Sequence, residues 1–281
     1  MPDKLMCIAF GPYPAQVYER QMGRWSRLLA PAFIDFINVR GGEKVLDVGC
    51  GTGSLTYALA ERAPDITIVG IDPLESSLDY ARINNPHPHR TSFELADGCN
   101  LPYPAGHFEC VVSALAINFI PDAATAVREM VRVTRPEGTV AATLWDMRGG
   151  LTHLRMVLDT AAAIDQGAAE WRTRFFAAPG TPPGALAELW HQAGLKQVKE
   201  TTLTVRLEFR AFADLWEPTM EAGLFGRYLR TISEVQREAI RQKVEAAYLC
   251  GDRDGPRSFA ATAWAVKGTV PSPVPAPPND R

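Results

Sequence analysis

Three alternating glycines follow a short apolar run that carries one acid. The run is Val45–Val48, its acid is Asp47, and the glycines are Gly49, Gly51 and Gly53, with a helical pattern directly after them. A glycine-rich turn between a buried strand and a helix lets main-chain N–H groups and the helix dipole approach a ligand closely. We therefore predict a nucleotide or cofactor site at this turn. The alternative is a tight turn without a ligand.

A second acid lies where a dinucleotide-type fold places its ribose-binding carboxylate. Asp72 ends the apolar run Ile66–Asp72, about twenty residues beyond the glycines. Its two oxygens can accept hydrogen bonds from vicinal ribose hydroxyls; the alternative is a surface acid that opens the helix expected from Leu74 to Ile83. Polar side chains lie at the carboxyl ends of five expected strands, where parallel sheets bind ligands: Asp47, Asp72, Asp97, Ser113 and Asp146.

Apolar strand patterns alternate with helical patterns through the first half of the chain. This alternation predicts an α/β fold, in which helices cover both faces of a doubly wound, mostly parallel sheet. The expected strands are Val45–Val48, Ile66–Asp72, Thr91–Ala96, Phe108–Ser113, Thr139–Asp146, Val198–Phe209 and Ser258–Val266. The other expected helices are Val127–Val133, Leu154–Ile164, Pro183–Ala193 and Ser233–Leu249, and a turn is expected at Pro136–Gly138.

The flanking segments are less regular. Residues 18–39 have apolar side chains at helical spacing, and Pro31 predicts a break between two helical pieces. The pattern of residues 167–180 indicates irregular structure, and 211–226 are rich in aromatic residues. We expect an N-terminal helical lid (1–40), a main domain (41–268) with helical insertions at about 150–185 and 211–250 that form a cap over the substrate, and a disordered proline-rich tail (269–281).

Composition excludes several classes of partner. The formal net charge is −3 and no Lys/Arg cluster occurs, which argues against nucleic acid and anionic membranes. The five cysteines are scattered without C-x-x-C spacing, so neither a metal site nor a disulfide framework is expected. No apolar run reaches transmembrane length, and the start of the sequence lacks the pattern of a signal peptide. We expect a cytoplasmic protein.

Together these residues resemble a class I S-adenosylmethionine-dependent methyltransferase of the small-molecule, UbiE-like type. The acid and glycines of the first motif, the acids that end the second and third strands, and the segments 108–121 and 132–138 match that family. The resemblance implies S-adenosyl-L-methionine as cofactor and a Rossmann-like sheet of seven strands with the last strand antiparallel. The implied cofactor-binding residues are Asp47, Gly49, Cys50, Gly51, Gly53, Asp72, Pro73, Asp97, Gly98, Ser113 and Ala114, with Arg24 and Trp25 from the lid.

The implied reaction is an in-line transfer of a methyl group from sulfur to a small-molecule acceptor. Alignment of the reactants supplies a large share of the rate, so the sequence need not contain a catalytic base. Asp146 and His153 are the best candidates for one because both follow the fifth strand, whereas His107 and His191 are expected to be surface or packing residues. The acceptor, the accepting atom and the oligomeric state (monomer or homodimer) stay open.

Three alternatives stay open from the sequence. A methyltransferase acting on RNA or protein is the nearest, but Ser113–Ala116 replaces the Asn/Asp-Pro-Pro-aromatic motif that enzymes methylating a base amino group usually carry. An NAD-dependent oxidoreductase would use the glycines and Asp72 but gives no role to Asp47 or Asp97. A non-catalytic S-adenosylmethionine-binding protein is suggested by the lack of an evident base.

Overall fold

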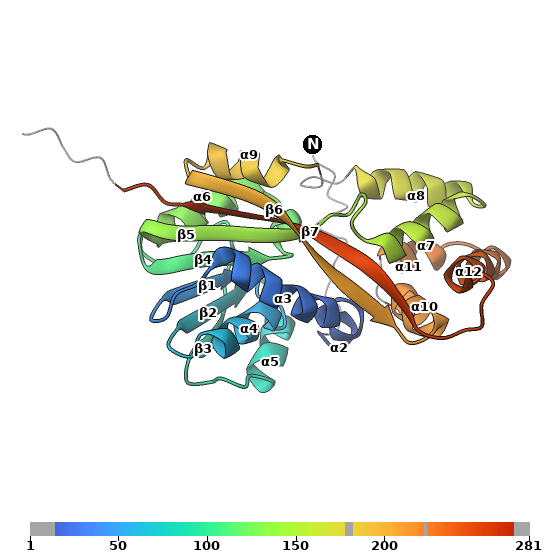
Figure 1. Cartoon of the computed structure of the whole chain (residues 1–281), viewed down its shortest axis with the longest axis horizontal. Coiled ribbons are helices and arrows are strands. Elements are labelled where there is room, and N and C mark those ends of the chain that lie inside the picture. Colours follow the sequence, from blue (N-terminus) through green and yellow to red (C-terminus); the bar gives the residue numbers. More distant parts are fainter. Residues whose placement is uncertain (1–14, 178–181, 222–223, 273–281) are drawn as a thin grey trace, which may run out of the picture.

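A mixed sheet organises the molecule. The computed structural model describes residues 15–177, 182–221 and 224–272, and within them seven strands form one sheet in the order β3-β2-β1-β4-β5-β7-β6 (Figure 1). The strands are β1 (Lys44–Val48), β2 (Thr67–Asp72), β3 (Thr91–Leu95), β4 (Phe108–Ala114), β5 (Thr134–Trp145), β6 (Lys196–Phe209) and β7 (Arg257–Thr269). Strands β1 to β5 pair in parallel, whereas β7 runs antiparallel to both β5 and β6. The expected fold class is confirmed.

Helices connect and cover these strands. An N-terminal segment of α2 (Ala15–Tyr18), the π-helix η1 (Glu19–Gly23) and α3 (Arg24–Ile37) precedes the sheet. The helices among the first five strands are α4 (Ser54–Arg62), α5 (Glu75–Ile83), the 3₁₀ turn η2 (Ile117–Phe119) and α6 (Ala123–Val133). The later helices are α7 (Thr152–Ala162), α8 (Gln166–Phe176), α9 (Ala185–Gln192), α10 (Phe212–Glu221), α11 (Leu224–Leu229) and α12 (Glu234–Leu249).

The central strands β1 and β4 are buried on both faces, to which the side chains of successive residues point in turn. In β1, Val45 packs with the side of the core built by α3 and α4, whereas Leu46 and Val48 pack with the side built by α6 and α9. All three side chains are almost fully buried. The sheet is therefore held rigidly between two helical layers, and the carboxyl ends of its strands form a fixed frame for a site.

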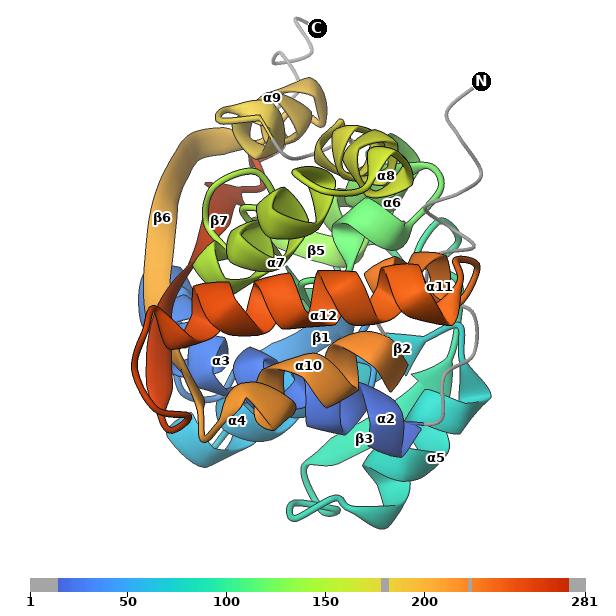
Figure 2. The ribbon, with the colours of Figure 1, turned by 90° about the vertical axis from the view of Figure 1, so that its right-hand side faces the viewer.

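The β6–β7 ribbon carries a helical cap beyond the end of the sheet. The ribbon is paired from Lys196 to Phe209, and its far end lies among α7, α8, α10, α11 and α12, which share one hydrophobic core (Figures 1 and 2). Helix α12 begins with a capping box, in which the Ser233 hydroxyl accepts from the Gln236 N–H and the Gln236 side chain accepts from the Ser233 N–H. The cap thus packs against the sheet as one cluster of helices.

Two expectations for helices were wrong. The break expected at Pro31 is absent, and α3 runs through this exposed proline to Ile37. Proline removes one helical hydrogen bond, but Leu29, Phe33 and Ile34 bury the opposite side of the helix and hold it together. The irregular step lies earlier, in the π-helix η1. Residues 166–176, mostly expected to be irregular, form α8, whose N-terminus is capped by the Asp165 carboxylate accepting from the Ala168 N–H at 2.8 Å.

Two element boundaries also differ. The turn expected at Pro136–Gly138 lies within β5, where Glu137 has a positive φ of 62° and the pairing with β4 changes register. Strand β7 extends to Thr269, and Val270 is buried in the core, so the packed chain continues past the expected start of the tail. Three expected pieces lie outside the described part of the chain, namely 1–14 of the lid, 178–180 of the irregular stretch and 273–281 of the tail. In the described helices, no segment has both the length and the apolar character needed to cross a membrane.

Candidate active site

The glycine-rich turn between β1 and α4 adopts a backbone that favours glycine. Gly49, Gly51 and Gly53 have φ values of 75°, 54° and 90°. A Cβ at Gly49 would lie 2.4 Å from the Cβ of Ala116, and one at Gly53 would lie 2.6 Å from the Tyr57 ring. At Gly51 it would meet no protein atom within 4 Å. Glycine is thus required for packing at two positions and for backbone conformation at all three.

Most of the N–H groups at the start of this turn are used within the protein. The N–H groups of Gly49 and Cys50 donate to the carbonyl of Ile71, at 2.8 and 2.9 Å, and the Gly51 N–H donates to Asp72 at 3.0 Å. We expected main-chain N–H groups of this turn to face a ligand, but these three donate to protein oxygens instead. Their hydrogen bonds join the turn to the end of β2 and fix its shape.

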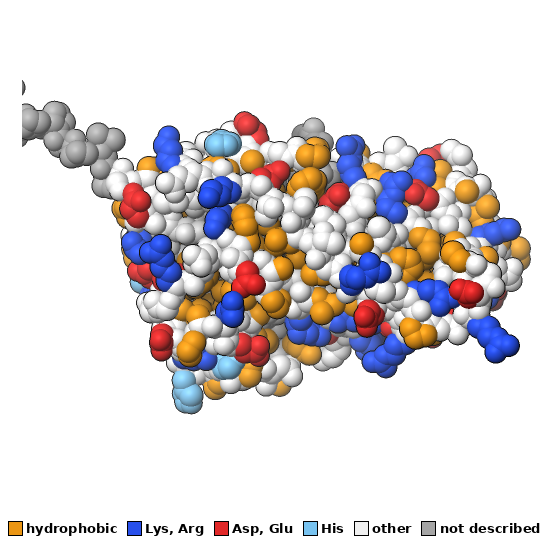
Figure 3. Space-filling model, in the orientation of Figure 1, with side chains coloured by type: hydrophobic (Ala, Val, Ile, Leu, Met, Phe, Trp, Pro, Cys, Tyr) orange, Lys and Arg blue, Asp and Glu red, His pale blue; other side chains and the backbone are white. Residues whose placement is uncertain are grey.

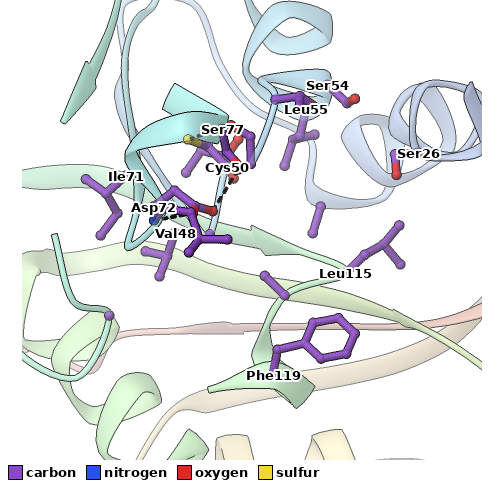
Figure 4. A pocket seen from close by; sticks show the side chains of 18 of the residues that line it. Ser26, Val48, Cys50, Ser54, Leu55, Ile71, Asp72, Ser77, Leu115 and Phe119 are labelled. Carbon is purple, nitrogen blue, oxygen red and sulfur yellow. Dashed lines mark hydrogen bonds between the residues drawn. The ribbon is translucent and has the colours of Figure 1, made fainter. Parts of the chain in front are cut away.

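A large cavity lies over the turn and the carboxyl ends of β1, β2 and β4. This loop cavity has a volume of about 460 Å³ (Figure 4). Of the residues predicted to bind the cofactor, those that line it are Asp47, Gly49, Cys50, Gly51, Asp72, Pro73, Asp97, Gly98 and Ala114. Sequence-distant residues complete the wall: Ser26 comes from α3, and Leu115 and Phe119 lie across the cavity from it (Figure 4).

Unpaired polar atoms occur on the wall of the loop cavity. Asp47 is 1 % exposed; its Oδ2 accepts from the Thr56 hydroxyl at 2.7 Å, whereas its Oδ1 has no partner among the described residues. Burial raises the pKa of the Asp47 carboxyl to about 7, even though the Thr56 hydrogen bond acts in the opposite direction. The Ser54 hydroxyl is also buried and without a partner there. A buried carboxylate with a free oxygen suits a cationic group such as an ammonium.

The two other acids take different positions. Asp72 lies at the end of β2 and is mostly buried, and burial raises the pKa of its carboxyl. Its Oδ1 accepts from the Leu74 N–H at 2.9 Å in addition to the bond from Gly51, so the carboxylate is fixed in the cavity wall. Asp97 is exposed at the rim beyond β3, and its carboxylate accepts from the Cys99 N–H at 2.8 Å. Both retain lone pairs for a ligand.

Four residues predicted to bind the cofactor do not line the loop cavity. Ser113 is fully buried behind the wall, where its hydroxyl donates to the Val48 carbonyl at 2.8 Å. Gly53 precedes α4 and packs on Tyr57. Arg24 and Trp25 line a second cavity instead. Among the described residues, no cluster of three His, Cys, Asp or Glu side chains is arranged to hold a metal ion.

This second cavity lies beneath the cap helices and has a volume of about 150 Å³. Its wall is mainly aromatic and aliphatic, and it comes from α3, the end of β5, α7, α8, β6, α10 and α11. The cap cavity shares three lining residues with the loop cavity, namely Tyr18, Leu115 and Phe119. The two cavities are therefore neighbours that share part of their wall, which we call the junction.

Of the junction residues, Tyr18 belongs to the expected lid, whereas Leu115 and Phe119 were not singled out from the sequence. Leu115 follows β4 with a positive φ of 58°, a strained conformation for a branched side chain that is typical of functional sites. Its N–H donates to the Thr143 carbonyl at 2.7 Å, which ties it to β5. Tyr18, the residue before η1, is the junction residue that comes from the N-terminal segment. The signal available in the sequence was the position of Leu115 directly after a buried strand.

Polar groups in the cap cavity are few. The Arg24 guanidinium forms an ion pair with Asp214 at 2.8 Å and lies over the Trp25 ring, with its Cζ 3.9 Å from the ring centroid. His153 lines the cavity beside Phe209, with 5.4 Å between ring centroids. Asp146, the other candidate base, lines neither cavity; its carboxylate accepts from the N–H groups of Arg148 and Gly149 and holds the turn after β5.

Comparison with known proteins identifies the family. The model of the methyltransferase domain matches residues 46–142. Nocamycin O-methyltransferase of Saccharothrix syringae is 30% identical over 209 residues, which are 70% of this chain and 74% of that protein. Trans-aconitate 2-methyltransferase of Methylobacterium radiotolerans is 27% identical over 202 residues, which are 66% of this chain and 76% of that protein.

Solved structures show the same fold. Phosphoethanolamine N-methyltransferase 2 of Haemonchus contortus, in complex with S-adenosyl-L-methionine, superposes with a TM-score of 0.58 at 15% identity. The superposition covers 92% of this chain and 57% of that one. With the glycine turn, the acids at the strand ends and the cavity above them, the chain therefore belongs to the class I S-adenosylmethionine-dependent methyltransferases.

Proposed function

We propose that this methyltransferase acts on a small, largely apolar acceptor that binds in the cap cavity. The observation that carries the proposal is the junction of Tyr18, Leu115 and Phe119, which belongs to both cavities. The cofactor in the loop cavity and an acceptor in the cap cavity would meet there. Relatives whose names specify small molecules, such as nocamycin and trans-aconitate, support a small acceptor, and the apolar character is inferred from the wall of the cap cavity.

The loop cavity fits the separate parts of the cofactor. Asp47 would hold the ammonium of the methionine end, because its free oxygen is buried beside the glycine turn. Asp72 would accept the ribose hydroxyls, and Asp97 with Gly98 would lie beside the adenine. S-adenosyl-L-methionine supplies an activated methyl group on a sulfonium cation. The positive charge on sulfur disappears during transfer, so dry apolar walls such as Leu115 and Phe119 favour the reaction.

Alignment is the main contribution that this geometry offers. An in-line displacement needs the acceptor atom, the methyl carbon and the sulfur in one row, and holding them so can remove about 7–11 kcal/mol of the barrier. The N-terminal segment would serve as a lid, because Tyr18 and Ser26 line the loop cavity while Met22 and Trp25 line the cap cavity. A link from the Thr52 hydroxyl to Glu19 would fasten this lid to the glycine turn.

The surface and the cavity size favour a small acceptor over a macromolecule. Acidic and basic side chains are interspersed over the face shown in Figure 3, as expected for a chain of net charge −3. Nucleic-acid binding depends on contiguous positive charge that neutralises phosphates. We also propose a monomer or homodimer, which light scattering during size-exclusion chromatography would test.

Transfer of a labelled methyl group tests the proposed function. The protein is incubated with methyl-tritiated S-adenosylmethionine and a bacterial cell extract, which is then separated into small-molecule, protein and nucleic-acid fractions. We expect the label in the small-molecule fraction. Label confined to protein or nucleic acid would contradict the proposal.

A matched pair of variants links that activity to the cap cavity. Thr219 lines the cavity, and its hydroxyl donates to the Leu215 carbonyl at 2.8 Å. Thr173 makes the same bond to Ala169 at 2.9 Å but is exposed on α8. Thr219→Trp should fill the cavity and abolish labelling while leaving the affinity for S-adenosylhomocysteine unchanged. Thr173→Trp should leave both unchanged.

A further inference from the structure

If the acceptor binds in the cap cavity, as proposed above, the polar groups of that cavity indicate the chemistry of the acceptor. Three atoms on residues that line this cavity are buried and have no hydrogen-bond partner among the described residues. They are the Nε of Arg24, the indole Nε1 of Trp145 and the Nδ1 of His153. Buried polar atoms without a partner are rare in folded proteins, and each costs about 1–3 kcal/mol. A bound acceptor that pairs with them would remove this cost.

Two of the three atoms are fixed donors. The Arg24 Nε and the Trp145 Nε1 each carry a hydrogen and have no lone pair to offer, so their complement is an oxygen that accepts. Thr143 lines the loop cavity and Trp145, two residues further along β5, lines the cap cavity. Because side chains two apart on a strand point the same way, Thr143 and Trp145 lie on the side of β5 that faces the two cavities.

The third atom belongs to an uncharged imidazole. His153 packs against Phe209 and Phe259, with ring centroids 5.4 and 6.4 Å apart, and Arg24 lies on Phe209 as well, with its Cζ 5.3 Å from the centroid. Burial, and then the charge of Arg24, lower the pKa of His153 to about 4. The ring is therefore neutral at physiological pH, with one nitrogen free to accept a proton.

The charges around the cavity select among possible acceptors. Its titratable lining residues are Tyr18 from α2, Arg24 from α3, His153 from α7 and Asp214 from α10. Asp214 already neutralises Arg24, so the cavity has no net positive charge for a permanent carboxylate. A weakly basic imidazole can take a hydroxyl proton only as the bond to the methyl carbon forms, and it does so more easily the more acidic the hydroxyl is. An enol or a phenol is uncharged and much more acidic than an aliphatic alcohol, so it suits the cavity better.

We propose that the acceptor carries an enolic or phenolic hydroxyl on an apolar body, and that His153 receives the hydroxyl proton during transfer. The O–H bond breaks and the proton goes to a ring nitrogen of His153, while the oxygen forms a bond to the methyl carbon. The bond from carbon to sulfur breaks, and its electron pair stays on sulfur. The products are a methyl ether, neutral S-adenosylhomocysteine and a proton, which His153 releases to solvent. Arg24 and Trp145 bind an adjacent acceptor oxygen.

The first test compares three acceptors that share one ring system. A naphthol, a naphthylamine and a naphthoic acid are each incubated with the protein and labelled S-adenosylmethionine, and the labelled product from cell extract is identified by mass spectrometry. We expect transfer to the naphthol at least about tenfold faster than to the other two, and a methyl ether from the extract. Preferred labelling of an amine, a carbon or a carboxylate would overturn the inference but leave the proposed function standing. Absence of any labelled small molecule would overturn both.

The second test uses the pH dependence of His153→Gln. Below the pH at which the naphthol ionises, we expect kcat/KM to fall about a hundredfold, the usual range for loss of a base. Above that pH the acceptor is already an anion, so the deficit should shrink towards zero. A deficit that is the same at every pH would show that His153 only shapes the cavity, and would overturn its role.

Two controls accompany this profile. The affinity of His153→Gln for S-adenosylhomocysteine should match that of the unchanged protein, which shows that the loop cavity is intact. His191→Gln, at an exposed position on α9, should keep the activity and its pH profile. A matching loss in His191→Gln would contradict a specific role for His153.

Discussion

The Asp72 carboxylate accepts a hydrogen bond from the Gly51 N–H, with 3.0 Å between the two atoms. This bond joins the last residue of β2 to the middle of the glycine turn. The residue expected to bind the ribose therefore also holds the turn that forms the wall beside it. If Asp72 binds the ribose as proposed, one side chain both recognises the ribose and fixes the shape of the turn.

Replacing Asp72 should affect binding more than it affects the fold. We expect Asp72→Ala to weaken S-adenosylhomocysteine binding by about 1.5–3 kcal/mol, the range for hydrogen bonds to a charged group, because ribose contacts are lost and the turn is loosened. Isothermal titration calorimetry measures the change. Asp79→Ala, at an exposed position on α5, should leave the dissociation constant unchanged. An unchanged constant for Asp72→Ala would remove this residue from the site.

The glycines of the turn should differ in what they tolerate. Gly49→Ala would place a Cβ 2.4 Å from that of Ala116, at a φ of 75°, so we expect it to lower the free energy of unfolding by about 1–3 kcal/mol. Gly51→Val also carries the cost of a positive φ, but its Cβ meets no protein atom within 4 Å, so we expect weaker cofactor binding in addition to a loss of stability, since Gly51 lines the loop cavity. Urea unfolding measures the loss of stability, and titration calorimetry measures the loss of cofactor binding. Gly255→Ala, with open space and no positive φ, is the control.

Asp47 should make the stability of the protein depend on pH. Its folded-state pKa of about 7 lies above the ordinary value of 3.8, so the folded protein binds this proton more tightly than the unfolded chain. The contribution to the free energy of unfolding therefore falls as pH rises from about 4 to about 7 and is constant above that window. We expect Asp47→Asn, which removes the charge, to flatten this part of the curve.

Urea unfolding at a series of pH values measures the effect of Asp47. The difference between Asp47→Asn and the unchanged protein should grow from about pH 4 to pH 7 in favour of the variant, which should bind S-adenosylhomocysteine more weakly. Asp65→Asn, an exposed acid, should give no such difference. A difference in the free energy of unfolding that does not vary with pH would contradict the raised pKa of the Asp47 carboxyl.

The ion pair between Arg24 and Asp214 should couple α3 to α10. The two side chains are 27% and 24% exposed, so the pair is partly shielded from water. In a double-mutant cycle of Arg24→Ala and Asp214→Asn, we expect a coupling of about 1 kcal/mol in the free energy of unfolding, reduced by added salt. The pair of Arg62 and Asp35, 68% and 64% exposed, should give about 0.5 kcal/mol or less in the same cycle. Equal coupling energies for the two pairs would show that partial shielding from water does not strengthen the pair of Arg24 and Asp214.

The cofactor half of the molecule was largely predictable from the sequence. Parallel strands are buried on both faces, so β1, β2 and β4 appear as apolar runs, and the carboxyl ends of such strands meet at one edge. That rule placed Asp47, Asp72 and Asp97 around one cavity. It failed for Ser113, because a residue near the end of a strand can point behind the cavity wall, where this hydroxyl bonds to Val48.

The acceptor half was much less predictable. The junction brings Tyr18 together with Leu115 and Phe119, and contacts between segments so far apart in the chain follow no fixed spacing. Arg24 and Trp25, expected beside the cofactor, line the cap cavity instead, because the direction of a helix relative to the sheet is set by packing of its apolar face. The α8 helix was missed because its N-terminal cap, Asp165, was not recognised.

The lining of the cap cavity bears on how such enzymes diversify. The methyltransferase-domain match spans residues 46–142, and within it the cap cavity takes only Leu115, Asn118 and Phe119. Its other lining residues come from the segments before and after. If the acceptor binds in the cap cavity, as proposed, its choice can change while the glycine turn and the strand-end acids within 46–142 stay the same. A chimera that keeps residues 46–142 and receives both flanking segments from a relative should acquire the relative's acceptor.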